Sequence, residues 1–536
     1  MSLSVRYTRR ATLVGLATLP LSASDACSGT SGRATASILD YLPAAQHAAI
    51  AAGTSRFDCA PALQRAIDQT AGQTTTLTLP AGRYIVMPAT KLDHADPRFP
   101  CLTALLMRSG MHLRGTAQTH LQIPDQFSTD ALPRAMAMFG SDVPLHSIAI
   151  EQLVVDMNGA RNPISPSRNT HYYSRAPQAH IFVSGRPGGQ AAKIDDIAIS
   201  DCRFTGSNGV SCIVMGQTEN SESLGSGWHI RTCTFADNGD DTDDHSSIYG
   251  YADDVVIENC LFTNRKLFDG RGGNTGYEVH GSNHQITGNI FRNYMRGIWV
   301  ANNMASTVTN TRIVRNTFNV MFYGVDFFNN TSLAHSIKNT IISDNLFTFD
   351  DAGFDTIPQL NLKVAVQIAS EYAQTDVTIQ NNRMTKAGTK VASAFVVVTG
   401  GAEGTNRHNR IFVKGNRGEG MTFGSFLRTT PTAGLGSIAI TDNVWTNLTP
   451  AGAFMVATGD GVERSAHDQP IQSLTLGGGR VIETRASRRP VPAVVINGWV
   501  KNLTLSPISL PNGQTDPLVF GGAGRVDSTR GTISVR

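Results

Sequence analysis

A short pattern recurs through the middle of the chain and limits its fold more than any other feature. An aliphatic residue is followed three positions later by Asn or Cys and five positions later by an aromatic residue, as in Ile257, Cys260 and Phe262. From Ile199 to Ile342 the aliphatic position recurs at intervals of 31, 27, 29, 27 and 29 residues. Weaker copies follow it: Ile379, Val413 and Ile440. A period of this length indicates structural units that repeat and stack on one another.

The composition favours short strands joined by tight corners. Charged residues make up only 16% of the chain, which contains 51 glycines, and this balance suits many strands and turns. A short strand cannot bury a face alone, but coils stacked about 4.8 Å apart bury a continuous column of aliphatic and aromatic side chains. We therefore predict a mostly β chain in which Ile257, Ile286 and Ile313 stack as buried neighbours.

The position that Asn and Cys share has a structural explanation. An Asn repeated at one corner can bond the backbone and the next Asn along the stack, which satisfies polar groups of the turn. Cys202, Cys233 and Cys260 occupy the same position, so we expect buried thiols there rather than disulfides. Cys59 and Cys101 flank the first strands and are better candidates for a disulfide.

The N-terminal residues have the pattern of an export signal. Three arginines precede an apolar run at residues 11–21, which is too short to span a bilayer, and no later run is long enough. We expect a removable signal at residues 1–26 and a linker at 27–52, which predicts a periplasmic or extracellular protein. The Arg9-Arg10 pair resembles a twin-arginine signal, although such pairs also occur in ordinary signals, and Cys27 leaves a lipid anchor open.

The charge distribution argues against a nucleic-acid partner. The formal net charge is only +3, and the arginines are scattered without the basic clusters that a nucleic-acid footprint needs. The sequence does not indicate an oligomeric state.

A helix and a strand are predicted before the repeats. Within residues 57–68, four apolar residues fall on one helical face: Ala62, Leu63, Ala66 and Ile67. The strand-like sequence Thr-Leu-Thr-Leu follows at 76–79, and Pro-Ala-Gly-Arg-Tyr follows at 80–84. This arrangement resembles the N-terminal region of the pectate-lyase-like superfamily, in which a helix caps the open end of a β-helix.

The resemblance has consequences for the fold and for the partner. It implies an all-β, single-stranded right-handed parallel β-helix with an N-terminal capping helix at residues 53–505, followed by a β-rich C-terminal segment at 506–536. It also implies a polysaccharide partner. It does not choose a reaction, because lyases, hydrolases, epimerases and phage tailspikes share this beginning.

Aligning the repeats superposes one strand from each coil. The first and third positions are mostly apolar and should point inward, so the second and fourth should point outward. The first outward column contains Tyr249, Glu278, Trp299 and Asp326. The second contains Tyr251, His280, Ala301 and Phe328. Carboxylates and a His can transfer protons, and the aromatic rings of Tyr249, Trp299 and Phe328 can stack on sugars, so this face is the predicted site.

Two long loops lead into these strands and should form the wall of a cleft. The first, at 236–247, contains His245 as a candidate substrate contact. It also has four carboxylates with the density for a hard cation such as Ca²⁺, although not with the spacing of an EF-hand: Asp240, Asp241, Asp243 and Asp244. The second loop, at 263–276, contains two cations: Lys266 and Arg271.

The tetrapeptide Tyr-Glu-Val-His at 277–280 is the most informative motif. It resembles the active strand of mannuronan epimerases and related β-helix lyases, in which an acid and a His two residues apart work with a Tyr and a basic residue. The resemblance implies that His280 and Glu278 match this pair. The phenol would come from Tyr251 or Tyr277, and the cation from Lys266 or Arg271. Glu replaces the usual Asp, Val replaces Pro, and the family's acid on the following coil falls at Ala301.

Three functions remain open at this point. The first is proton abstraction at C5 of a uronic acid, with His280 as the leading residue, in a lyase or an epimerase. The second is inverting glycoside hydrolysis by Glu278 and Asp326, whose backbones should lie about 9 to 10 Å apart if they are two coils apart. The third is a non-catalytic β-helix that binds glycan through its aromatic columns.

Overall fold

The computed structural model describes the following residues of the 536-residue chain: 33–92, 101–129, 132, 134–163, 178–183, 192–216, 225–239, 245–264, 274–302, 308–329, 336–351, 362–369, 373–400, 407–430, 433–448, 453–458, 469–485, 492–510, 518–521 and 524–531. For Asn302, Phe328, Asn329 and residues 455–458 it describes the backbone alone. The predicted export signal and Cys27 lie outside these residues.

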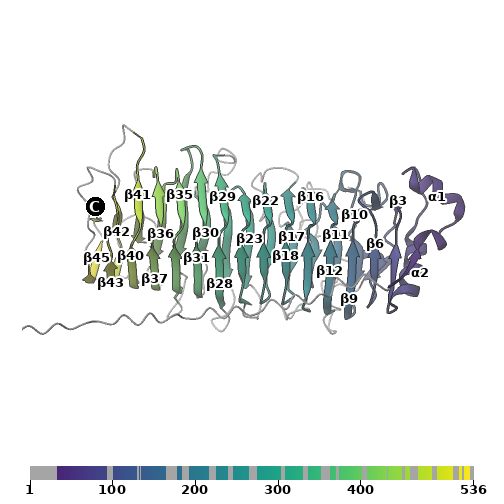
Figure 1. Cartoon of the computed structure of the whole chain (residues 1–536), viewed down its shortest axis with the longest axis horizontal. Coiled ribbons are helices and arrows are strands. Elements are labelled where there is room, and N and C mark those ends of the chain that lie inside the picture. The colour runs from purple at the N-terminus through teal and green to yellow at the C-terminus, as the bar shows by residue number, and fades with distance from the viewer. Residues whose placement is uncertain are drawn as a thin grey trace, which may run out of the picture.

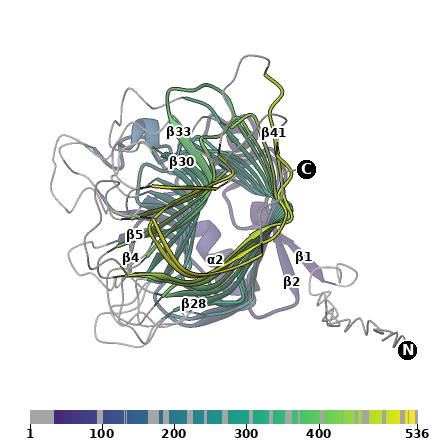
Figure 2. The same ribbon diagram turned by 90° about the vertical axis from the view of Figure 1, so that its left-hand side faces the viewer.

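The chain folds into a right-handed parallel β-helix, as predicted. Within the described residues, three long sheets contain 17, 13 and 15 strands, and they run along the length of an elongated stack (Figure 1). Sheet A runs from β1 (Ala34–Ser37) to β45 (Arg525–Arg530), and sheet B runs from β3 (Gly82–Ile85) to β41 (Arg480–Ile482). Seen along the axis, the three sheets surround the interior of the stack (Figure 2).

Sheet C carries the candidate site. Its strands are β4 (Thr90–Leu92), β5 (Cys101–Leu106), β8 (Met136–Ser141), β11 (Gln178–Val183), β14 (Ser211–Val214), β17 (Ser246–Gly250), β20 (Thr275–Val279), β23 (Arg296–Asn302), β27 (Tyr323–Asn329), β30 (Leu362–Ala369), β33 (Ala392–Thr399), β36 (Phe423–Thr429), β39 (Phe454–Thr458), β42 (Val494–Asn497) and β44 (Leu518–Phe520). Its described strand pairs are parallel apart from the pair of β4 with β5.

Two helices lie at the N-terminal end of the stack (Figure 1). They are α1 (Ala44–Ala51) and α2 (Ala60–Thr70). The predicted apolar face of α2 is buried and belongs to the same core as the interior of the β-helix: Ala62, Leu63, Ala66 and Ile67. The helix thus shields from water the core that the first coil would otherwise expose, which confirms the predicted cap.

The interior contains columns in which the same residue type recurs from coil to coil. Ile257 pairs with Ile286, and Ile286 pairs with Ile313, and all three are fully buried, as predicted. A stack of phenylalanines runs beside them, with ring centroids 4.7 to 5.1 Å apart. Its members are Phe204, Phe235, Phe262, Phe291, Phe318 and Phe347. The sequence period therefore reports the step from one coil to the next.

The predicted asparagine column is a continuous hydrogen-bonded ladder. Asn316 donates from Nδ2 to the carbonyl oxygen of Ile286 at 2.8 Å and to Oδ1 of Asn345 at 3.1 Å. Its own Oδ1 accepts from the backbone N–H and the side-chain amide of Asn289. The same bonds recur at Asn382 and at later ladder positions. Each amide thus satisfies a backbone N–H and a backbone carbonyl of the preceding coil and bonds the next amide of the ladder.

The cysteines follow one prediction and contradict another. Cys202, Cys233 and Cys260 take the place of Asn in the first coils of the ladder and are buried free thiols, as predicted. The expectation of a disulfide involving Cys59 and Cys101 is wrong, because both are free. Cys59 belongs to the interior core, whereas Cys101 belongs to a separate cluster on the outer face of sheet C, so a sheet lies between them.

The strands of sheet C depart from strict alternation at one step. A Cβ on Gly297 would lie only 2.4 Å from a ring carbon of the interior Phe318, and Ile298 is also part of the core, so two successive residues face inward. Gly276 and Gly324 occupy the same position in the neighbouring coils. The residue before each glycine is consequently turned outward, including Arg296.

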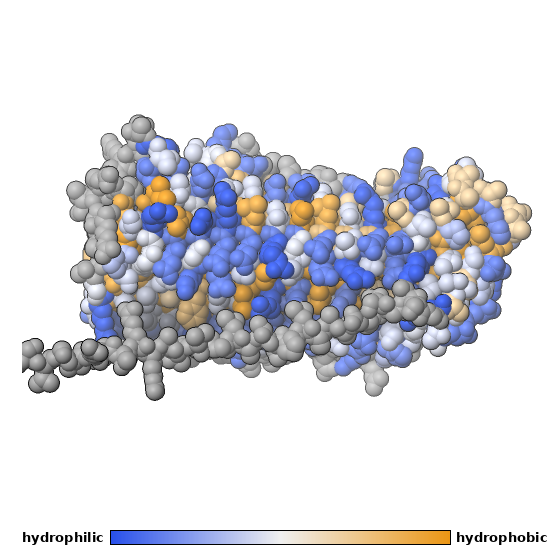
Figure 3. Space-filling model, in the orientation of Figure 1, coloured by the Kyte–Doolittle hydropathy of each residue, from blue (hydrophilic) through white to orange (hydrophobic). Residues whose placement is uncertain are grey.

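The far end of the stack continues the same pattern. β43 (Trp499–Leu505) pairs in parallel with β45, and β42 pairs in parallel with β44. Hydrophilic residues cover most of the face visible in Figure 3, with apolar residues scattered between them. No helix within the described ranges is long and apolar enough to cross a membrane.

Candidate functional site

The outer face of sheet C brings the predicted site residues into register. Tyr249 pairs with Glu278, Glu278 with Trp299, and Trp299 with Asp326, so these four side chains form one column across four coils. His280 comes directly after β20, two residues beyond Glu278, and therefore lies on the same face.

Apolar clusters flank this part of the face on both sides. On the N-terminal side, Phe182 pairs with Val214, and both belong to a buried outer cluster. On the C-terminal side, Val364 and Val397 belong to another buried outer cluster, against which Phe423 packs. The carboxylates, the His and the phenols of the outer face gather in the coils between these clusters.

His280 is held by a carboxylate and a phenol. Its Nε2 lies 3.1 Å from Oε2 of Glu278, whose other oxygen accepts a hydrogen bond from Ser246. The imidazole stacks on Tyr251 with ring centroids 4.4 Å apart and planes 10° apart. The hydroxyls of Tyr251 and Tyr249 lie 2.9 Å apart. The arrangement fixes the orientation of His280 from two sides.

The cluster is almost completely buried. Glu278 and His280 are only 3% and 2% exposed. Burial raises the pKa of Tyr251 well above its ordinary value, and the neighbouring Tyr249 and Glu278 raise it further, so the phenol is protonated at neutral pH. Within the described part of the chain, Nδ1 of His280 is buried and makes no hydrogen bond. That nitrogen is free to accept a proton once Nε2 binds Glu278.

A second group of charged residues lies further along the face, with Arg296 one coil beyond Glu278 and Asp326 two coils beyond it. Nε of Arg296 is 3.0 Å from Oδ2 of Asp326, and the guanidinium lies over the ring of Trp299 at 4.3 Å from its centroid. Burial raises the pKa of Asp326 to about 6, although Arg296 opposes the shift. Burial and the charge of Asp326 also raise the pKa of Tyr323 to about 12. This end of the face therefore holds a cation, an easily protonated acid and two aromatic rings.

Several predicted residues are not part of this arrangement. Tyr277 points into the interior, where its hydroxyl lies 2.5 Å from Nδ1 of His284, so of the two predicted phenols Tyr251 is the one on the outer face. His245 is 1% exposed, and its Nδ1 lies 2.8 Å from the carbonyl oxygen of Gly209, so it is a buried corner residue in this structure, and its role as a substrate contact stays a prediction.

Other predictions lie outside the described residues. They are the second-loop cations Lys266 and Arg271, and the carboxylates Asp240, Asp241, Asp243 and Asp244. Phe328 is in β27, paired with Ala301, but its side chain is outside the description. No cluster of three or more His, Cys, Asp or Glu side chains suited to a metal occurs among the residues that the structure describes. The calcium site stays a prediction.

The sequence did not indicate three residues of this face. Ser246, Arg296 and Tyr323 occupy the outward position just before the inward step described above. Strict alternation would have pointed them into the core. The signal for their placement is the glycine that follows Arg296 and Tyr323, because a residue without a side chain is needed where the backbone approaches an interior phenylalanine.

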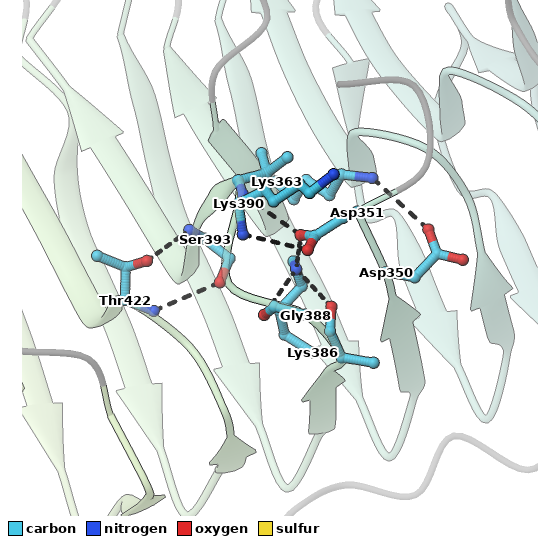
Figure 4. Close-up of polar contacts among 10 residues, drawn as sticks. Asp350, Asp351, Lys363, Lys386, Gly388, Lys390, Ser393 and Thr422 are labelled. Atoms are coloured by element: carbon cyan, nitrogen blue, oxygen red, sulfur yellow. Dashed lines mark hydrogen bonds and ion pairs between the residues drawn. The ribbon is translucent and has the colours of Figure 1, made fainter. Parts of the chain in front are cut away.

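A separate polar cluster lies where the chain passes from sheet B to sheet C (Figure 4). Lys386 binds Asp351 and two backbone carbonyls of the following turn. Nζ of Lys363 lies 3.9 Å from Asp350 and 5.5 Å from the centroid of Phe322, and burial lowers its pKa to about 8. Both lysine side chains are 1% exposed, whereas Asp350 is largely exposed, so the two buried lysines serve to anchor the corner.

Comparison with known proteins relates the chain to phage tailspikes by structure alone. No protein family and no curated protein matches it by sequence. A tailspike mutant of E. coli bacteriophage HK620 in complex with a hexasaccharide superposes with a TM-score of 0.58 at 15% identity, over 92% of this chain and 80% of that chain. Another mutant, in complex with a pentasaccharide, gives 0.57 at 16% over the same shares. At this identity the likeness establishes the shared β-helix fold.

Proposed function

We propose that this protein acts on an anionic polysaccharide, and that His280 removes the proton at C5 of a uronate residue, which leads to β-elimination or epimerisation. The observation that carries the proposal is the contact of His280 with both Glu278 and Tyr251 on one outer face. It supplies a base, a carboxylate that orients the base and a phenol that can give up a proton. The oligosaccharide complexes of tailspikes with this fold support a glycan as the ligand.

Glu278 sets the direction of proton transfer. When Nε2 of His280 carries the proton, it donates a hydrogen bond to Glu278, and Nδ1 then carries the lone pair. In elimination, Nδ1 takes the C5 proton, the C4–O bond breaks as the C4=C5 double bond forms, and Tyr251 protonates the departing oxygen. In epimerisation, C5 takes a proton on its opposite face from a donor on the other side of the sugar, because Tyr251 stacks on His280 and lies on the same side as the base. Because His280 is 2% exposed, the substrate can reach Nδ1 only if the groups around the imidazole rearrange.

Arg296 is a described cation on this face and could hold the uronate carboxylate. Its charge is balanced by Asp326 as long as that acid is ionised. Since the pKa of Asp326 is about 6, the acid becomes neutral below that pH and leaves the guanidinium charge uncompensated. A carboxylate would then bind Arg296 more strongly in mildly acidic solution.

One observation favours inverting hydrolysis as a second candidate. Glu278 and Asp326 lie in one column two coils apart, so their backbones are about 10 Å apart, which leaves room for a water molecule beside the sugar. The raised pKa of Asp326 suits a general acid. The third candidate, binding without reaction, uses the aromatic rings of Tyr249, Trp299 and Tyr323.

Digestion of a panel of anionic polysaccharides tests the proposal. Elimination should give products with the ultraviolet absorbance of an unsaturated uronate, and epimerisation should change the ratio of uronate epimers without shortening the chain. Reducing ends without this absorbance would contradict the proposal and support hydrolysis. Binding with neither product would support the non-catalytic alternative.

Replacing Asp326 by Asn separates the first two candidates. If Arg296 holds the uronate, the amide leaves its charge free, so KM at neutral pH should fall by about 5-fold with little change in kcat. In the wild type, KM should rise between about pH 5 and 7 as Asp326 ionises, and this rise should be absent from the variant. Loss of kcat by about 100-fold or more would instead identify Asp326 as a hydrolytic acid. Asp344→Asn, an exposed position, is the matched control.

A further inference from the structure

Three arginines form a column on the outer face of sheet B, away from the face described above. Arg383 in β32 (Arg383–Lys386) pairs with Arg417 in β35 (Arg417–Glu419), and the column continues through Val444 in β38 (Val444–Thr446) to Arg480 in β41. All three arginines are exposed. β35 and β41 lie in the C-terminal half of the stack in Figure 1.

The described part of the protein does not compensate these three charges. Within the described residues, none of these guanidinium groups makes a hydrogen bond or an ion pair. Glu419 lies in the next outward column, but it makes no ion pair with any of them. Arg383 and Arg417 are direct neighbours in adjacent coils, and like charges in that relation destabilise a sheet. An anion placed between them would remove the repulsion.

The arginines line a groove of about 290 Å³ whose other walls suit a sugar. Val444 provides an apolar surface between Arg417 and Arg480, on which the C–H face of a pyranose can pack. Glu419 and Thr446 face the same groove from the next column and can bond sugar hydroxyls. None of the described residues that line the groove is aromatic, so they offer no platform on which bases could stack.

We propose that this groove is a second binding site for an anionic polysaccharide, separate from the candidate catalytic face. Arg383 and Arg417 are one coil apart, about 4.8 Å, and Arg480 follows two coils later, so the charges repeat along the axis as they do on an acidic polymer. The ligand chemistry is a carboxylate or sulfate group on a sugar. The choice of polymer rests on the proposed function, but the site does not depend on His280.

The test measures binding in a His280→Ala background, in which the polymer is not consumed. Three substitutions are combined: Arg383→Gln, Arg417→Gln and Arg480→Gln. We expect the affinity for polygalacturonate at low salt to fall by about 10-fold and the salt dependence of binding to become shallower. Dextran, which is neutral, should bind weakly to both proteins. A sulfated polysaccharide in place of polygalacturonate distinguishes sulfate from carboxylate recognition.

A matched control removes the same charge elsewhere. Arg231, Arg292 and Arg312 are exposed and lie outside the groove, and their replacement by Gln should leave the affinity within about 2-fold of the parent. Two results would overturn the proposal. One is an equal loss of affinity in both triple variants. The other is that replacing the groove arginines weakens the binding of single-stranded DNA more than the binding of polygalacturonate. Full activity of His280→Ala on the substrate of the wild-type enzyme would contradict the proposed function and leave the groove untouched.

Discussion

Replacing His280 by Ala is expected to lower kcat on the anionic polysaccharide by about 10²- to 10⁴-fold, the range usual for loss of a proton-transfer residue. The reason is that Nδ1 of His280 is the proposed base, held in place by Glu278 and Tyr251. Turnover of unsaturated or epimerised product measures the effect. Unchanged circular dichroism would show that the fold is intact.

Two further variants are needed to interpret the effect of His280→Ala, one as a control and one as a comparison. His229→Ala removes an exposed His from β15 (Trp228–Arg231) in sheet A and should leave kcat unchanged. Glu278→Gln should be milder than His280→Ala if Glu278 only orients the imidazole, and equally damaging if Glu278 is a hydrolytic carboxylate. Full activity of His280→Ala would exclude proton abstraction by this residue and leave hydrolysis by Glu278 and Asp326 as the catalytic candidate.

Replacing Asn316 by Leu should lower the free energy of unfolding by about 3 to 5 kcal/mol, more than any other substitution proposed for this chain. The substitution leaves the backbone N–H of Asn289 and the carbonyl oxygen of Ile286 buried without their partners. It also removes both amide contacts to the neighbouring ladder side chains, including that with Asn345. The midpoint of unfolding in denaturant is the measurement.

Asn319→Ala is the control for the ladder. Asn319 is exposed on β26 (Thr317–Asn319), only three residues from the ladder position. Its replacement should change the free energy of unfolding by less than about 0.5 kcal/mol. Equal effects of Asn316→Leu and Asn319→Ala would mean that the ladder contributes little to stability.

The interior could be predicted from the sequence because each coil repeats the same requirement. An error at one Ile would be contradicted by the next copy, so Ile257, Ile286 and Ile313 were placed together without a structure. The capping helix was predicted for a similar reason, since its four apolar residues recur at helical spacing. The register of Glu278 with Trp299 followed from the same alignment.

The features that the sequence did not predict depend on local backbone geometry, which the spacing of the repeats does not specify. Arg296 was missed because Gly297 and Ile298 both face inward, so the alternation shifts by one residue just before the site. Cys59 and Cys101 are near each other in the order of elements, but a sheet separates their side chains. Whether two side chains can meet depends on the face of the sheet that each one occupies. A single sequence predicts that face only where the alternation of apolar and polar residues is regular.

The asparagine ladder also bears on the chemical lifetime of the protein. Asparagine deamidates when the backbone nitrogen of the following residue attacks its side-chain carbonyl. In the ladder, that nitrogen is already bonded to another coil: Thr317 N–H donates to the carbonyl oxygen of Asn289 at 2.8 Å, and Leu346 N–H to that of Asn316 at 2.9 Å. The side-chain amide is held as well, so neither reacting group can approach the other. The ladder asparagines should therefore deamidate more slowly than exposed ones such as Asn319, as long as the stack stays folded.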